Sequence, residues 1–261
     1  MKNLFYLLFG IVFIVSFSSC SGIQEKAKSY ADDIVEAQLN GYSTQKSDAN
    51  NNFKSWVAGL SDEKREQLDE CWDETIATSF MNAFNEELTD IAEAIKGYSS
   101  WNVKSSYEKF EKRIIKIDEE YQESAEYSLS VFLKKYFKTD FEGYANSVFE
   151  AIKAEDKFGL ERADKDFYKL CDRHKDFPSV VSAFKYAYKD YMIKEFEDYL
   201  KETDKETEKV FKTRDEDKIT NYFKDKTKQF NMLFSKAGEC VKEAYYSAYE
   251  SMKSKLREEF N

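Results

Sequence analysis

The chain of 261 residues carries 50 acidic and 40 basic side chains, which gives a formal net charge of −10. Binding of nucleic acid, or of an anionic lipid surface by charge alone, requires a concentrated basic surface, so this composition argues against both functions. The 22 phenylalanines and 18 tyrosines provide ample apolar material for a core, which argues against disorder over most of the chain.

The N-terminus has the three-part layout of a secretory signal peptide. Met1-Lys2 forms a short basic start, an apolar run extends from Leu4 to Phe17, and Ser18-Ser19 supplies small residues at its end. The apolar run is shorter than the roughly 20 residues that a helix needs to span a bilayer. We therefore predict that residues 1–19 are a signal peptide.

The end of this segment, Phe17-Ser18-Ser19-Cys20, resembles the lipobox of bacterial lipoproteins. The resemblance implies cleavage before Cys20 and acylation of its thiol and its new amino group, for example with palmitate. It implies an anchor in the bacterial cell envelope. Ser21 lacks the acidic character associated with inner-membrane retention, which favours the outer membrane over the inner one but leaves the membrane open. The side of the membrane stays open. An ordinary cleaved signal, or an uncleaved anchor, is the alternative.

The segment after Cys20 is predicted to contain one short helix and one loop. We expect a membrane-proximal helix at about residues 23–39, followed by a loop at 40–53, where Asn, Ser and Asp predominate. Residues 20–53 would then be a lipid-anchored N-terminal segment, and residues 54–261 the main helical domain.

Two long amphipathic helices are predicted next, at about 62–96 and 99–137. In both segments apolar residues recur at steps of three or four, which places them on one helix face. The second forms a heptad seam that suits either an intramolecular bundle or a coiled coil between chains. The expected apolar faces consist of Leu68, Trp72, Ile76, Phe80, Phe84, Leu88, Ile91 and Ile95, and of Tyr107, Phe110, Ile114, Ile117, Tyr121, Ala125, Leu129, Phe132 and Tyr136.

The remainder of the chain also has helical periodicity, and no apolar–polar alternation indicates strands. Shorter helices are expected at 141–157 and 160–175, a break at Pro178, and then two further amphipathic helices, the last of which ends near Phe260. The charged segment 201–218 is predicted to be a solvated helical extension or a hairpin tip. We predict an all-α fold, an elongated bundle of six to eight helices with some long, coiled-coil-like members.

Three cysteines follow Cys20, namely Cys71, Cys171 and Cys240. An odd number of widely spaced cysteines does not indicate a disulfide framework, so we expect buried thiols. One disulfide and one remaining thiol is the alternative, because export would allow oxidation.

The search for catalytic motifs yields no catalytic residue, no metal site and no cofactor. His174 is the single histidine, which excludes a di-iron bundle and a zinc site built from several histidines. Cys171 and His174 share a helix face, but their spacing alone specifies neither a metal site nor a nucleophile–base pair. We expect the protein not to be an enzyme.

The tyrosines are distributed over more than one helix face. Tyr186 and Tyr246 lie off the apolar stripes of their helices and are weak candidates for ligand binding. Packing at the margin of the core is the preferred explanation for them.

Together these features predict an exported, lipid-anchored helical protein that binds another protein of the envelope. Its partners would be the membrane, through lipid on Cys20, and an envelope protein, but not nucleic acid. The alternative is a receptor for a sugar or peptide that uses an aromatic groove. An enzyme with a cleft around Cys171 and His174 is a third, less favoured interpretation.

Overall fold

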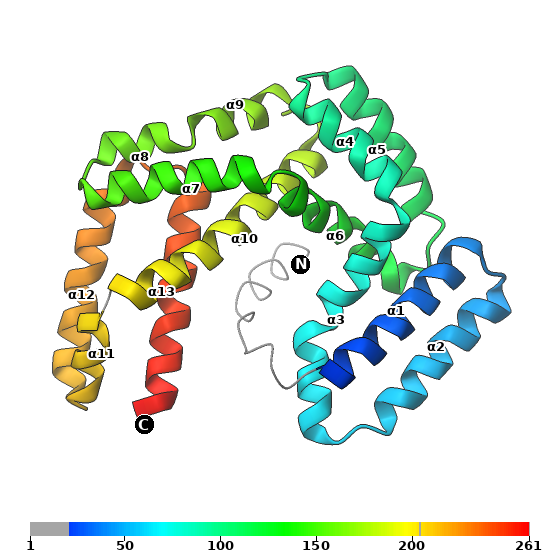
Figure 1. Ribbon diagram of the computed structural model, residues 1–261, viewed down its shortest axis with the longest axis horizontal. Helices are drawn as coiled ribbons and strands as arrows, with labels where there is room; N and C mark the ends of the chain where they lie inside the picture. The colour runs from blue at the N-terminus through cyan, green and yellow to red at the C-terminus, as the bar shows by residue number, and fades with distance from the viewer. Residues whose placement is uncertain (1–20, 204, 261) are drawn as a thin grey trace. The chain divides into compact units, whose positions relative to one another are not determined.

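A computed structural model describes residues 21–203 and 205–260 (Figure 1). Within these residues the chain forms 13 α-helices and one short 3-10 helix, and no strands. The predicted all-α fold is confirmed, whereas the predicted number of six to eight helices was too low. The main reason is that several segments with one continuous apolar stripe are divided into two helices.

The chain divides into two compact units, and each is described separately. The N-terminal unit comprises the described residues up to 136 together with 173–183, and the C-terminal unit comprises 137–172 and the described residues from 184 onward. Cys20 and the signal segment lie outside the described residues.

The N-terminal unit is a packed set of six helices with an aromatic and aliphatic core. Helix α1 packs against α2 and α3, α3 packs against α6, and α4 packs against α5 (Figure 1). Phe84 is fully buried and meets the Phe110 ring edge to face, with 5.3 Å between the ring centroids. The six helices are α1 (Ser21–Asn40), α2 (Ser43–Ala58), α3 (Asp62–Ala83), α4 (Asn85–Lys96), α5 (Ser100–Ile114) and α6 (Glu119–Tyr136).

Both long predicted helices are interrupted. The first is broken at Phe84, whose φ of −103° and ψ of 11° leave the helical range, so that α3 contacts α1 and α6 while α4 contacts α5. The second is broken between Ile114 and Glu119, and the turn is held by Gln38, whose amide nitrogen donates to Asp118 Oδ2 at 2.9 Å. The heptad seam is nevertheless buried or half-buried along its whole length.

The prediction of a loop at residues 40–53 was wrong, because Ser43–Ala58 forms α2. No residue of α2 is buried, so the segment lacks the periodic apolar signal that identifies other helices. Polar contacts contribute to its stability. The Tyr42 backbone N–H donates to Gln45 Oε1 at 2.8 Å, and Lys46 pairs with Asp118 at 3.2 Å. The expected boundary between residues 53 and 54 falls inside this helix.

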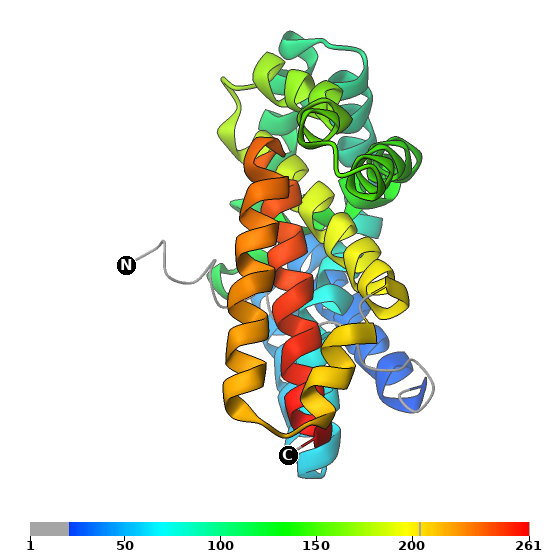
Figure 2. The same cartoon turned by 90° about the vertical axis from the view of Figure 1, so that its left-hand side faces the viewer.

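The C-terminal unit contains α7 (Lys138–Lys153), α8 (Lys157–Ala163), α9 (Lys165–Arg173), most of α10 (Pro178–Thr203), α11 (Lys205–Lys212), α12 (Glu216–Leu233), the 3-10 helix (Phe234–Lys236) and α13 (Glu239–Phe260). Helices α11, α12 and α13 lie side by side (Figure 2). Within the charged segment 201–218, α11 and the start of α12 form a helical hairpin. The side chains of Thr207 and Phe211 in α11 are buried.

The core of the C-terminal unit is a group of mutually packed aromatic rings. The centroid of the Phe167 ring lies 4.3 Å from that of Tyr188 and 4.9 Å from that of Phe184. The Phe141 ring contacts all three. Such pairs stabilise a core beyond the area that they bury, by about 0.5–1.5 kcal/mol each. Among the residues described in both units, no helix is sufficiently long and apolar to cross a membrane.

Candidate functional site

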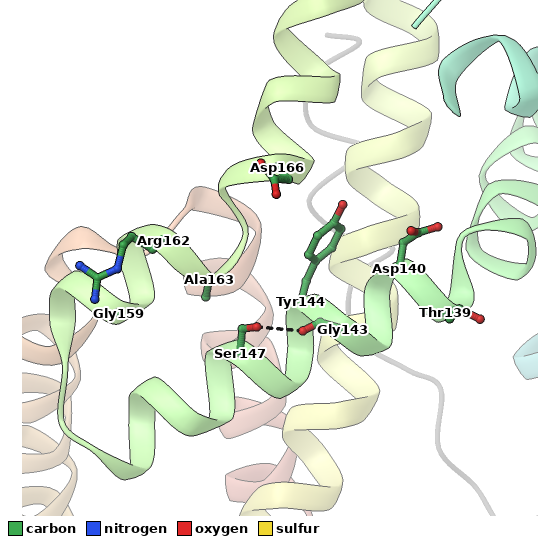
Figure 3. Close-up of a pocket in the computed structure, with 9 residues that line it drawn as sticks. All are labelled: Thr139, Asp140, Gly143, Tyr144, Ser147, Gly159, Arg162, Ala163 and Asp166. Carbon is green, nitrogen blue, oxygen red and sulfur yellow. Dashed lines mark hydrogen bonds between the residues drawn. The ribbon is translucent and has the colours of Figure 1, made fainter. Parts of the chain in front are cut away.

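An open groove of about 570 Å³ lies between α7 and the α8–α9 segment of the C-terminal unit (Figure 3). Small residues leave room for it, and Tyr144 projects from α7 between Asp140 and Asp166. Its lining consists of Thr139, Asp140, Gly143, Tyr144, Ser147, Gly159, Arg162, Ala163 and Asp166.

The charged groups of the groove already have partners within the protein. Arg162 Nη2 lies 3.3 Å from Asp156 Oδ2, and Lys169 Nζ donates to Asp166 Oδ1 at 2.5 Å. This hydrogen bond from Lys169 holds the pKa of the Asp166 carboxyl below its usual value. The groove therefore offers hydroxyl and paired charged groups, an arrangement suited to a polar uncharged ligand.

Immediately behind the groove, Asp164 is buried at the junction of α8 and α9. Its backbone N–H donates to the Arg162 carbonyl at the end of α8, and its carbonyl accepts from the Tyr168 N–H at 3.2 Å in α9. The side chain is forced inward and is only 1% exposed, and its Oδ2 has no hydrogen-bond partner among the described residues. Burial raises the pKa of Asp164 to about 6.

Three further polar residues surround Asp164 and complete what we call the Asp164 cluster, namely Tyr168, Tyr188 and Cys240. The Cys240 N–H donates to the Tyr168 hydroxyl at 2.9 Å. The Tyr188 hydroxyl is buried without a hydrogen-bond partner in the described chain, and burial, followed by the nearby Asp164, raises its pKa. Tyr188 also contacts Tyr144, with 5.9 Å between the ring centroids, which connects the cluster to the groove.

The two cysteines of the C-terminal unit are buried, and their surroundings keep the thiols unreactive. Burial raises the pKa of Cys171 to about 12 and that of Cys240 to about 11, so both are protonated at neutral pH. A thiolate is the nucleophilic form and the metal-binding form of cysteine. Cys71 is half-buried in α3, and no disulfide forms among the three cysteines of the described chain.

Cys171 and His174, the pair singled out in the sequence, lie in different compact units. Cys171 belongs to the C-terminal unit and His174 to the N-terminal unit, and both are buried. Burial lowers the pKa of His174, and the backbone of Ile95 partly offsets this shift. Within residues 21–203 and 205–260, no three His, Cys, Asp or Glu side chains are grouped so as to hold a metal ion.

Tyr186 and Tyr246, the ligand-binding candidates, do not line the groove. Tyr186 is half-buried on α10 beneath the Lys189 ammonium, which lies 5.9 Å from the ring centroid, and Tyr246 is 53% exposed on α13. Lys189 also pairs with Glu243 at 3.2 Å. Tyr246 contacts the Phe230 ring, with 6.5 Å between the ring centroids, so the two tyrosines have different surroundings.

The sequence reasoning missed an exposed aromatic surface on the N-terminal unit. Trp101 at the start of α5 is 77% exposed, and Tyr98 in the preceding turn is 53% exposed. The Arg173 guanidinium carbon lies 4.0 Å from the centroid of the Tyr98 ring. We call these three residues the Trp101 surface. The available signal was two aromatic residues three positions apart, Tyr98 in the turn and Trp101 at the start of the next helix.

A second aromatic group of the N-terminal unit is half-buried between α1, α2 and α3. The Tyr30 ring stacks on Trp56 at 4.9 Å, and Phe53 stacks on Trp72 at 4.1 Å. These contacts account for the docking of α2, which buries no residue fully. The group is therefore a structural contact, although a shallow hollow of about 430 Å³ lies beside Phe53.

The chain matches no protein-family model, no curated protein and no solved structure.

Proposed function

We propose that this is a lipid-anchored, non-enzymatic protein of the bacterial envelope that binds another envelope protein. The observation that carries the proposal is the exposure of Trp101, 77%, beside Tyr98 and Arg173. Trp, Tyr and Arg are the residue types that contribute most to binding energy at protein interfaces. An exposed tryptophan together with a tyrosine and an arginine has the composition of a protein interface, which a partner would cover.

The anchoring part of the proposal is supported by the lipobox-like sequence that ends at Cys20. Each buried methylene of an acyl chain contributes about 0.8 kcal/mol, so two or more chains hold a protein on a membrane stably. The test is metabolic labelling with an alkyne-tagged palmitate. We expect labelled protein in the outer-membrane fraction and neither label nor membrane association in the Cys20→Ala variant. Equal labelling of both forms would refute the assignment.

The binding part is tested with a photo-cross-linking amino acid placed at Trp101 in living cells. We expect a discrete cross-linked species that contains one envelope protein. The matched control is the same amino acid at Tyr42, which is 81% exposed on the same unit and takes part in none of the cation–π contacts found in the described residues. Absence of a species from position 101, or the same species from both positions, would contradict the proposal.

A second candidate function, binding of a small polar ligand such as a sugar, is supported by the groove of about 570 Å³ between α7 and α8. Its test is a thermal-shift screen of sugars and short peptides on the full chain. A ligand whose stabilising effect disappears in the Tyr144→Ala variant but persists in Tyr246→Ala would favour this function over protein binding.

A further inference from the structure

We propose that the Trp101 surface recognises a protein segment that presents a carboxylate beside an apolar side chain, and that Arg173 is the receptor for the carboxylate. The inference rests on the proposed protein-binding function and specifies the chemistry of its partner.

The first argument is the state of Arg173. Arg65, Arg113 and Arg162 each pair with an acidic side chain, at 3.8, 2.5 and 3.3 Å. No described carboxylate pairs with Arg173, although the chain contains 50 acidic residues. Its guanidinium instead stacks on the Tyr98 ring, a contact that holds the planar group by its face and leaves the N–H edges available. These edges match a carboxylate in a two-hydrogen-bond arrangement.

The second argument is that the surface is held in place before any partner arrives. Tyr98 has a φ of 57°, and this left-handed turn after α4 is fixed by the Ser99 N–H, which donates to the Ala94 carbonyl at 3.0 Å. Ser100 Oγ donates to the Arg173 carbonyl at 3.3 Å, which connects the turn to the start of the α9–α10 connection. A preorganised surface loses little conformational entropy on binding.

The third argument is the electrostatics of α5. Helices α3, α4 and α6 each carry two acidic residues in their first turn, where the helix dipole favours negative charge, whereas α1 and α2 carry none. The first turn of α5, which contains Trp101, carries none. A carboxylate near Arg173 would therefore also lie near an unneutralised helix N-terminus.

Trp101 supplies the apolar part of the surface. Its indole is 77% exposed at the second residue of α5, three residues after Tyr98 in the chain, and presents an apolar face to solvent. Covering an aromatic side chain of this kind with an aliphatic or aromatic partner side chain excludes water from the neighbouring charge pair, which strengthens that pair. The carboxylate and the apolar group must therefore be adjacent in the partner segment.

The test uses a phage-displayed library of random heptapeptides, panned on the detergent-solubilised full chain. We expect the enriched peptides to contain Asp or Glu adjacent to a large apolar residue, and to lose binding when that acid is replaced by its amide. Binding should weaken at least tenfold in Arg173→Gln and in Trp101→Ala. Arg173→Lys should weaken binding as well, because it keeps the charge but loses the planar fork.

The matched controls are Arg214→Gln and Tyr42→Ala. Arg214 is exposed, has a φ of 52° and pairs with no described carboxylate. Unlike that of Arg173, its guanidinium does not lie over an aromatic ring of the described residues. Tyr42 is exposed and takes part in no cation–π contact in the described part of the chain. Both variants should bind the peptides as the wild type does, and circular dichroism should confirm that all variants are folded.

Several outcomes would overturn the inference, and they separate it from the proposed function. Enriched peptides without a carboxylate, or peptides that bind Arg173→Gln normally, would refute the carboxylate while the cross-link from position 101 would still support protein binding. Loss of both the cross-link and peptide binding would refute both. Arg173-dependent binding to anionic phospholipid vesicles, or Arg173-dependent dimerisation, in place of peptide binding would assign the surface to a lipid or to a second copy.

Discussion

The buried carboxyl of Asp164 leads to a prediction about stability. Replacing Asp164 with Asn keeps the size of the side chain and removes a charge that has no partner for its Oδ2 in the described chain. The amide can also donate a hydrogen bond, for which the nearby Tyr188 and Tyr168 hydroxyls are acceptors. We expect Asp164→Asn to stabilise the C-terminal unit at neutral and alkaline pH.

The magnitude follows from the pKa of Asp164. The difference between the ordinary carboxyl value of 3.8 and about 6 corresponds to about 3 kcal/mol. The folded state binds the proton of Asp164 more tightly than the unfolded state does, so protonation stabilises the folded state. This contribution to the unfolding free energy is complete below about pH 3.8. It declines as the pH rises and is lost above about pH 6. Asn does not titrate, so the gain of the variant over the wild type should be about 3 kcal/mol at pH 8 and small at pH 4.

The assay must report on the C-terminal unit, because a chain of two units need not unfold in one step. Trp56, Trp72 and Trp101, the only tryptophans, all lie in the N-terminal unit, whereas the buried thiols Cys171 and Cys240 lie in the C-terminal unit. Samples of a Cys71→Ser background, equilibrated in urea at each pH, therefore receive a short pulse of thiol reagent at one common pH. The labelled fraction gives the unfolding free energy.

The control is Asp166→Asn, an exposed carboxyl next to the same helix junction whose pKa is lowered by Lys169. It should leave the unfolding free energy nearly unchanged. A loss of stability in Asp164→Asn at pH 8 would refute the reasoning, because it would mean that the buried carboxylate is charged and stabilised by a partner such as an ordered water.

Three further predictions concern other positions. Gly238→Ala should destabilise the C-terminal unit by about 1–3 kcal/mol in the thiol-pulse assay, because a Cβ there would lie 2.6 Å from Asp164 Oδ2 and closer still to the Tyr168 ring; unchanged stability would show that the ring moves aside at little cost. His174→Leu should flatten the pH dependence of the N-terminal unit, followed by tryptophan fluorescence in urea. Since burial lowers the pKa of His174, the wild type should lose stability as the pH falls below the ordinary value of 6.5, and a parallel loss in the variant would exclude this histidine as the cause. Glu155→Gly should stabilise the C-terminal unit by about 0.5–1 kcal/mol, because Glu155 has a φ of 51° and glycine relieves the left-handed strain; a lower urea midpoint would contradict this.

The apolar stripes of the sequence predicted which residues are buried better than they predicted where helices end. The stripe through Phe80, Phe84 and Leu88 is fully buried, as expected, although the helix is interrupted at Phe84. A stripe records only which side chains face the core, and a single non-helical residue preserves its spacing. The position of such a break depends on the helices packed on either side, which a local pattern does not contain.

Helix α2 and the candidate sites could not be predicted from the sequence, for a different reason. The Asn-rich segment of α2 becomes helical through partners that lie far along the chain, such as Asp118 and Tyr121. Likewise Asp164 is one of 50 acidic residues, and it is distinguished only by burial against Gly238. Arg173 is distinguished by its contact with the Tyr98 ring, which lies far away in the sequence, in the turn between α4 and α5. Residue type and spacing cannot reveal contacts of this kind.

The start of α1 has a mechanical consequence if Cys20 carries lipid. The helix begins at Ser21, and its first fully buried residue is Ala27, which at a rise of 1.5 Å per residue lies only about 9 Å further along the axis. A lipoprotein with a long flexible tether can search a volume many nanometres deep. Here the N-terminal unit would be held close to the bilayer surface, without a long flexible tether. Its reach would be limited to molecules embedded in the same membrane or pressed close to it.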